Sequence, residues 1–125
     1  MKNLLLVGLG GALGSMLRYL ATLFTTEHIS CFPAIYGTLA VNVIGSLLIG
    51  VIYGWSEKYS WFSPQLNCLF ATGLCGGFTT FSAFAGDNVR LLQHGHFGMA
   101  AGYILLSVVL CIAATFAGTM MVKTS

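Results

Sequence analysis

Neutral hydrogen-bonding side chains recur every four residues in two otherwise apolar stretches of the sequence. Thr38, Asn42 and Ser46 form the first line, and residues four apart share one face of an α-helix. The second line comprises Tyr103, Ser107, Cys111 and Thr115. Hydroxyl and amide groups can replace water around a small ion, and several weak sites in a row let the ion leave again. The two lines therefore indicate passive movement of a small ion, with a clasp between helices as the alternative for Asn42.

Helix-breaking and hydroxyl residues interrupt a third apolar stretch, between positions 72 and 84. Glycines weaken helical continuity, and neighbouring hydroxyls can satisfy the backbone groups that a break sets free. The residues concerned are Gly73, Gly76, Gly77, Thr79, Thr80 and Ser82. The pattern predicts two half-helices that meet inside the membrane. Their free amides would attract anions and their free carbonyls would attract cations.

Two phenylalanines follow the predicted break. Phe81 and Phe84 are three residues apart and so share a helix face, with Ser82 beside them. Aromatic ring edges carry partial positive charge, so they can meet an anion without trapping it as a full cation would. Ordinary packing is the alternative for such a pair. Arg18 also leaves two interpretations open, because a charge at membrane depth either snorkels to the interface or serves a function such as a pore mouth.

The elements that carry these residues are predicted to be membrane-spanning helices. Of the 125 residues 57% are hydrophobic and 6% charged, whereas a soluble domain is about a quarter charged. A spanning helix needs about 20 apolar residues, and four windows fit, at 3–24, 34–54, 65–92 and 98–122. The apolar runs are continuous rather than alternating, which argues against a β-barrel. We expect an all-α integral membrane protein, with one four-helix transmembrane domain over residues 1–125 and a third helix broken in mid-membrane.

Catalytic residue sets are missing from the sequence. It has no Ser-His-Asp or Cys-His set, no zinc-ligand spacing and no phosphate loop, so we expect neither an enzyme nor a nucleic acid partner. Glu27 and Glu57 fall in predicted connections, and Asp87 lies near a helix end, where pairing with Arg90 is expected. A small four-helix multidrug exporter would want a carboxylate within the membrane and is therefore the weaker alternative. A non-conducting membrane assembly subunit is the third possibility.

Basic residues are nearly balanced between the two predicted membrane sides. Lys2, Lys58 and Lys123 fall on one side, while Arg90 falls on the other, with Arg18 near that end. This is a weak positive-inside signal, and it is compatible with insertion in both orientations. Four short helices can barely bury two polar lines and a pair of half-helix ends, so a partner chain is expected to cover some of them.

Small residues other than those at the break are predicted to serve helix packing. Gly10 and Gly14 form a small-xxx-small face on the first helix, and Gly50 and Gly54 form another on the second. The scattered cysteines, without C-x-x-C spacing, are expected to pack rather than to form disulfides or bind metal. They are Cys31, Cys68, Cys75 and Cys111.

Three motifs occur in order along the first three predicted helices. They are Gly10-Gly11-x-x-Gly14 leading to Arg18-Tyr19, Gly37-Thr38-Leu39-x-Val41-Asn42-x-x-Gly45, and Gly73-x-Cys75-Gly76-Gly77-Phe78-Thr79-Thr80-Phe81-Ser82-x-Phe84. Together they resemble the bacterial fluoride channels of the CrcB/Fluc family, and the fourth helix is similar in its polar face and length.

The resemblance implies a fluoride-selective channel that exports toxic cytoplasmic fluoride across the bacterial plasma (inner) membrane. Such channels are antiparallel, dual-topology homodimers with two pores in the lipid bilayer. A structural sodium ion at the dimer centre would be held here by the backbone carbonyls of Gly76 and Thr79. The resemblance places the ion pathway at Asn42, Phe81, Ser82, Phe84, Tyr103 and Ser107. The pore-associated candidates are Arg18, which matches the family's basic residue, and Thr38 and Cys111 from the two polar lines.

Two positions depart from the family pattern. Ala83 stands where threonine is frequent, which removes a hydroxyl, and Cys111 stands where serine is common. A thiol is a poor hydrogen-bond donor, so Cys111 is expected to weaken donation late in the pathway.

Overall fold

Four helical segments long and apolar enough to cross a membrane make up the computed structural model, which describes residues 1–30 and 33–125. The first, second and fourth are α1 (Lys2–His28), α2 (Pro33–Lys58) and α6 (Phe97–Thr124). The third span, Pro64–Gln93, is built from several pieces. The predicted spans are confirmed, and each helix is a few residues longer than its apolar window. Cys31, expected to be a packing residue, lies outside the described residues.

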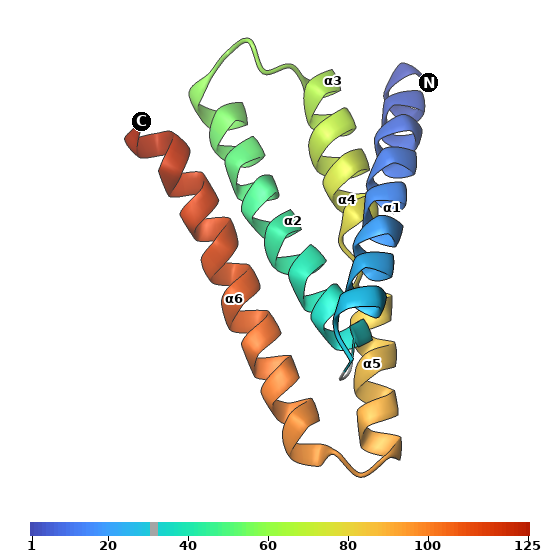
Figure 1. Cartoon of the computed structure of the whole chain (residues 1–125). Coiled ribbons are helices and arrows are strands. Elements are labelled where there is room, and N and C mark those ends of the chain that lie inside the picture. Colours follow the sequence, from blue (N-terminus) through green and yellow to red (C-terminus); the bar gives the residue numbers. More distant parts are fainter. Residues whose placement is uncertain (31–32) are drawn as a thin grey trace.

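The third span contains one π-helical piece and one break (Figure 1). It begins at α3 (Pro64–Asn67), where the Ser63 hydroxyl accepts a hydrogen bond from the Leu66 amide, and continues as η1 (Cys68–Cys75), which is π-helical, and α4 (Gly76–Phe78). After two extended residues the chain resumes as α5 (Phe81–Gln93). Short π-helical insertions in α-helices occur frequently at functional sites.

Of the three glycines before the break, Gly73 and Gly77 pack against α1, while Gly76 lies away from α1. All three remain helical. A side-chain carbon on Gly73 would meet the Val7 carbonyl oxygen at 2.9 Å, and one on Gly77 would meet the Gly11 backbone. On the facing side, a carbon on Gly14 would overlap the Leu74 carbonyl. Close backbone approach therefore explains Gly73, Gly77 and Gly14, and the extended segment begins two residues after the last glycine of the third span.

Helices α2 and α6 form a second close pair. A side-chain carbon on Gly50 would overlap the Thr115 carbonyl, and one on Gly118 would overlap the Leu47 carbonyl. Gly54 is similarly crowded by Val122 and Thr119. The small-xxx-small face predicted on the second helix is thus a helix contact, and α6 supplies its partner.

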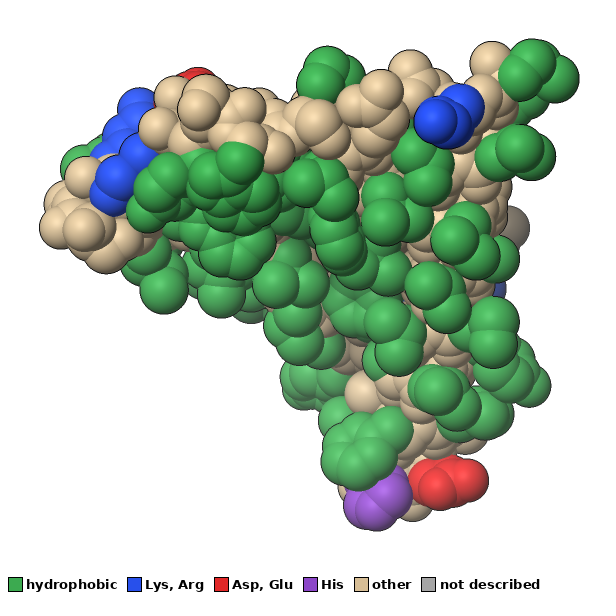
Figure 2. Space-filling model, turned by 90° about the horizontal axis from the view of Figure 1, so that it is seen from above, with side chains coloured by type: hydrophobic (Ala, Val, Ile, Leu, Met, Phe, Trp, Pro, Cys, Tyr) green, Lys and Arg blue, Asp and Glu red, His purple; other side chains and the backbone are tan. Residues whose placement is uncertain are grey.

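Hydrophobic side chains cover much of the surface, as the membrane requires. Figure 2 shows two arms that meet at an angle, with hydrophobic side chains lining the recess and charged side chains toward the edges. Both chain termini lie at one end of the bundle, with the α2–α3 connection, and the α5–α6 connection lies at the other (Figure 1). This places Lys2, Lys58 and Lys123 opposite Arg90, as the sequence predicts.

Candidate functional site

The centre of the candidate site is the two-residue gap between α4 and α5. Thr79 (φ −86°, ψ 158°) and Thr80 (φ −152°, ψ 116°) are extended, so the backbone ladder stops there. The Thr80 hydroxyl caps α5 by accepting a hydrogen bond from the Ala83 amide at 3.2 Å. The Thr79 hydroxyl donates to the Cys75 carbonyl at 2.9 Å. Both hydroxyls therefore satisfy groups at the break, the role predicted for them from the sequence.

Asn42 of α2 pairs with the backbone at the break. Its Oδ1 accepts from the Thr80 amide at 2.8 Å, and its Nδ2 donates to the Thr80 carbonyl at 3.2 Å. A carboxamide in an apolar environment is costly unless it is hydrogen-bonded. The clasp left open for Asn42 is thus present, and its partner is an interrupted backbone rather than another side chain.

The backbone carbonyls from Cys75 to Thr79, in and around α4, differ in their partners. Arg18 Nε donates to the Gly77 oxygen at 3.1 Å, so the guanidinium is held by the protein at the break. The Cys75 oxygen accepts from the Thr79 amide as well as its hydroxyl. Among the described residues, no donor is hydrogen-bonded to the carbonyl oxygens of Gly76 or Thr79. These two oxygens are the candidate cation ligands.

A cavity of about 350 Å³ lies beside the break between α2, α5 and α6. Seven of the site residues predicted from the sequence line this cavity: Asn42, Gly76, Thr79, Phe81, Phe84, Ser107 and Cys111. Ser46 and Thr80 also line it. Four others lie outside this lining, namely Arg18, Thr38, Ser82 and Tyr103. Residues from α2, from the third span and from α6 therefore meet around one cavity.

The two phenylalanines are placed differently within this site. Their ring centroids are 5.5 Å apart, which confirms that they share a face. Phe84 also contacts Tyr103 edge to face at 5.1 Å, whereas the Phe81 residue is 78% exposed. Ser82 is exposed, and its hydroxyl lies 3.2 Å from that of Thr80. Only Phe84 is thus packed within the described chain, and Phe81 is left open to a partner.

The first half of the α6 polar line faces the interior. Ser107 is buried at 6% exposure, and among the described residues its hydroxyl has no hydrogen-bond partner. The Tyr103 hydroxyl donates to the Asp87 carboxylate at 3.1 Å. Thr38 is buried as well. Ser107 is therefore a cavity-lining hydroxyl that is free to bind an ion.

The placement of Asp87 corrects the expectation of a surface pair with Arg90. Asp87 is 4% exposed and bonded to Tyr103, while Arg90 is exposed. Asp87 and Arg90 lie three residues apart on α5 but have different surroundings, because the buried Tyr103 hydroxyl of α6 binds Asp87 while Arg90 remains exposed. Sequence reasoning missed this residue, although a carboxylate within an apolar window is itself a signal.

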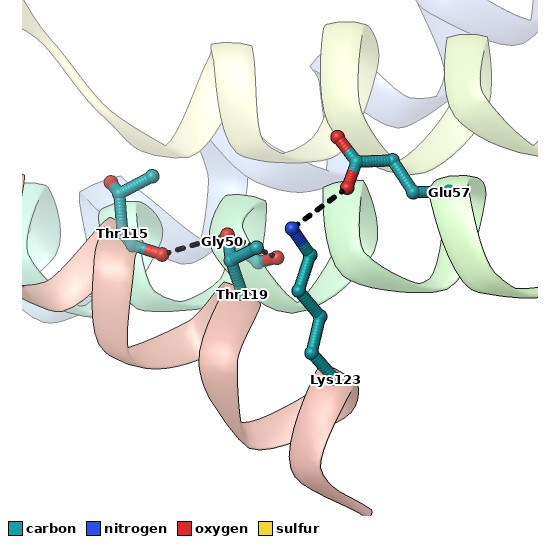
Figure 3. A network of polar contacts seen from close by, with 5 residues as sticks. All are labelled: Gly50, Glu57, Thr115, Thr119 and Lys123. Carbon is teal, nitrogen blue, oxygen red and sulfur yellow. Dashed lines mark hydrogen bonds and ion pairs between the residues drawn. The ribbon is translucent and has the colours of Figure 1, made fainter.

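The second half of the polar line on α6 begins at Thr115, and its hydroxyls connect α6 to α2 by hydrogen bonds. The Thr115 hydroxyl donates to the Ser46 carbonyl at 3.1 Å, and the Thr119 hydroxyl donates to the Gly50 carbonyl at 3.1 Å (Figure 3). Beyond them Lys123 Nζ lies 3.3 Å from Glu57 Oε2. Thr119 and Lys123 continue the four-residue spacing, so the periodicity could have identified them.

These features define a class of protein. A multi-pass helical membrane protein with a break in one span, and a cavity with neutral polar groups beside it, has the architecture of a small channel or transporter. Residues 5–119 match the family described as CrcB-like protein, Camphor Resistance (CrcB). With relatives that are 45–46% identical over nearly their whole length, the chain belongs to the CrcB/FluC family of fluoride-specific ion channels.

The similarity to individual relatives covers both chains almost completely. A protein of Leptospira interrogans named fluoride-specific ion channel FluC is 45% identical over 122 residues, covering 98% of this chain and 95% of its own. The FluC protein of Flavobacterium psychrophilum is 46% identical over 124 residues, covering 98% of each chain. That of Bacteroides fragilis is 42% identical over 120 residues, covering 94% of each.

Proposed function

We propose that this chain is a fluoride-selective channel that lets toxic cytoplasmic fluoride leave the cell passively. The observation that carries the proposal is the cavity at the break, lined by neutral donors and phenylalanines, in a chain whose full-length relatives are named fluoride-specific channels. It acts as a channel rather than an enzyme, in the bacterial inner membrane. Neutral donors bind an anion weakly enough for rapid release.

The ion pathway in this proposal follows the two polar lines. Ser107 supplies a donor within the cavity, and Asn42 supplies the second hydrogen of its Nδ2, since the first is bound to the Thr80 carbonyl. The edges of Phe81 and Phe84 complete the anion's surroundings. Tyr103 and Ser82 lie next to them along α6 and α5. Arg18, Thr38 and Cys111 are associated with the pore, with Arg18 acting through the α4 carbonyl that it binds.

An antiparallel homodimer completes the proposal. Phe81 is 78% exposed, and the recess of Figure 2 is lined by hydrophobic side chains, so both fit coverage by a second copy. In an antiparallel pair the two breaks would come together. The carbonyls of Gly76 and Thr79, which have no donor among the described residues, suit a structural sodium ion there, because hard cations prefer oxygen ligands. Each copy would form one transmembrane domain over residues 1–125.

A proton-coupled multidrug exporter is the second candidate, and one observation favours it. Asp87 is a buried carboxylate within a membrane span, which is the residue type that coupled transport uses. Its hydrogen bond from Tyr103 gives it a structural role as well. Family membership favours the channel.

Efflux from liposomes tests the function. Vesicles loaded with fluoride, with purified protein in their membrane, are expected to release it quickly when a potassium ionophore balances the charge, while chloride-loaded vesicles release little. If neither ion is released, the multidrug exporter and the non-conducting assembly subunit are the remaining candidate functions. A proton gradient that drives uptake of a cationic dye, abolished by Asp87→Asn, would establish the exporter.

A further inference from the structure

A second cavity continues the first toward one end of the bundle. It has a volume of about 550 Å³, and Ser46 and Cys111 line both cavities. From there its lining follows α6 through Thr115 and Thr119 to Lys123. Cys111 and Lys123 are 12 residues apart, which at about 1.5 Å per residue is about 18 Å, slightly more than half of a hydrocarbon core of roughly 30 Å. The α6 line thus runs from the cavity at the break to the membrane surface.

The threonines of this second cavity give little to an anion. The hydroxyl protons of Thr115 and Thr119 are directed at the carbonyls of Ser46 and Gly50. The same single proton is shared with the carbonyl four residues earlier in α6, which lies 3.0 Å from each hydroxyl oxygen. Their hydroxyls therefore present oxygen lone pairs to the cavity, which favour water or cations over fluoride.

The helix ends at this mouth are also unfavourable for an anion. Both α2 and α6 end here, at Lys58 and Thr124, and helix carboxyl ends carry partial negative charge. Lys58 Nζ is bonded to the Val122 carbonyl at 2.9 Å, so it is turned onto the α6 end. Of the described residues that line the cavity, only Lys123 carries a charge.

Glu57 lies against this lysine. The Lys123–Glu57 distance is 3.3 Å, and the two side chains are 51% and 64% exposed. Figure 3 shows Lys123 reaching from α6 toward Glu57 of α2, one turn beyond Thr119. An exposed pair of this kind adds little stability, so replacing either partner should leave the fold intact.

We propose that the cavity from Cys111 to Lys123 is one mouth of the ion pathway, and that Lys123 attracts fluoride into it while Glu57 reduces that attraction. This inference rests on the proposed fluoride channel function. Lys123 offsets the two helix ends and the acceptor-lined wall, so that the anion meets a positive potential before it reaches the cavity beside the break. Focusing by a charged mouth raises the local ion concentration and is screened by salt.

The test compares the two sides of the ion pair. Lys123→Gln and Glu57→Gln both remove the pair, so a merely structural role predicts that fluoride efflux changes in the same direction. The proposed role predicts opposite directions. At low ionic strength and subsaturating fluoride, the initial efflux rate should fall about two- to threefold for Lys123→Gln and rise by a similar factor for Glu57→Gln, as expected for one charge acting across several ångströms of water.

Salt and control variants complete the experiment. At about 1 M salt of an impermeant anion, where the screening length is about 3 Å, both variants should approach the wild-type rate, and Lys123→Arg should match it throughout. Lys2→Gln removes an exposed lysine from the same end of the molecule, outside this cavity, and should change little. Changes in one direction, salt-independent changes, or an equal effect of Lys2→Gln would overturn the inference. Wild-type vesicles without fluoride efflux would instead refute the channel itself.

Discussion

The carboxamide of Asn42 binds both backbone groups of Thr80, with Oδ1 accepting from the amide at 2.8 Å and Nδ2 donating to the carbonyl at 3.2 Å. In an unbroken helix the Thr80 amide would donate to the carbonyl four residues earlier, whereas the Thr80 carbonyl, at the N-cap of α5, is placed to accept the first bond of that helix. One side chain of α2 therefore supplies the acceptor that the amide loses at the break, and it holds the start of α5 against α2. The break and the α2 polar line form a single structural unit.

Removing this carboxamide should impair both folding and conduction. Asn42→Leu has nearly the same size but leaves the Thr80 amide without its acceptor, at a cost of about 1–3 kcal/mol. We expect a lower thermal unfolding temperature in detergent and a loss of most fluoride efflux. Asn3→Leu, at an exposed position of α1, is the matched control. An unchanged unfolding temperature for Asn42→Leu would contradict the proposed clasp.

Substituting two glycines of α1 by alanine distinguishes the effect of helix packing from the effect of helix propensity. Gly14→Ala would place a methyl group against the Leu74 carbonyl and the Phe78 amide, whereas a methyl group at Gly8 meets nothing within 4 Å. Gly14→Ala should therefore lower the unfolding temperature and, by shifting Arg18 away from α4, reduce fluoride efflux. Gly8→Ala should stabilise the helix by up to about 1 kcal/mol. Equal effects of the two substitutions would show that α1 tolerates displacement from α4.

The Tyr103 hydroxyl supports a buried carboxylate. Tyr103→Phe keeps the ring contact with Phe84 but removes the donor to Asp87. A hydrogen bond to a charged group is worth about 1.5–3 kcal/mol, so the unfolding temperature should drop measurably. In the double variant Tyr103→Phe/Asp87→Asn the unfolding temperature should drop by less than the sum of the two single effects, because no carboxylate remains to be left unpaired. Tyr36→Phe, at an exposed tyrosine, should be neutral. Full additivity in the double variant would rule out direct coupling.

The two phenylalanines should respond differently to substitution. Phe84→Ile removes contacts with Tyr103 and Phe81, so it should lower both unfolding temperature and efflux. Phe81 is 78% exposed, and Phe81→Ile should cost little stability within the single chain but reduce efflux strongly if its ring edge lines the pore. Circular dichroism melts and liposome efflux on the same preparations give both readouts. Normal efflux from Phe81→Ile would remove this ring from the pathway.

Sodium removal tests the proposed cation site. Replacing sodium by N-methyl-D-glucamine throughout purification should weaken the dimer and lower fluoride efflux, since the Gly76 and Thr79 carbonyls would lose the cation that they share. Re-addition of sodium should restore both, and size-exclusion elution reports the dimer. Identical elution and efflux in both cations would argue against a structural sodium ion.

Local features of the structure followed directly from sequence. Four apolar windows set the four spans because a membrane helix must satisfy its backbone within itself, and three-residue spacing set the shared face of Phe81 and Phe84. The hydroxyls after the glycines also indicated where a break could be satisfied. The packing face at Gly14 was visible as a small-xxx-small pattern, although its partner was not.

The sequence by itself thus determined the membrane class, the spans, the polar lines and, through its motifs, the family, since all of these depend on residue types at short fixed spacing. Only the tertiary structure decided which distant group each polar residue meets. It paired Asn42 with Thr80, buried Asp87 against Tyr103, and turned the Thr115 hydroxyl onto α2 rather than into the cavity. Periodicity gives the face on which a side chain lies. The partner on that face depends on how the helices cross, and that is settled by close backbone packing at glycines far apart in the chain.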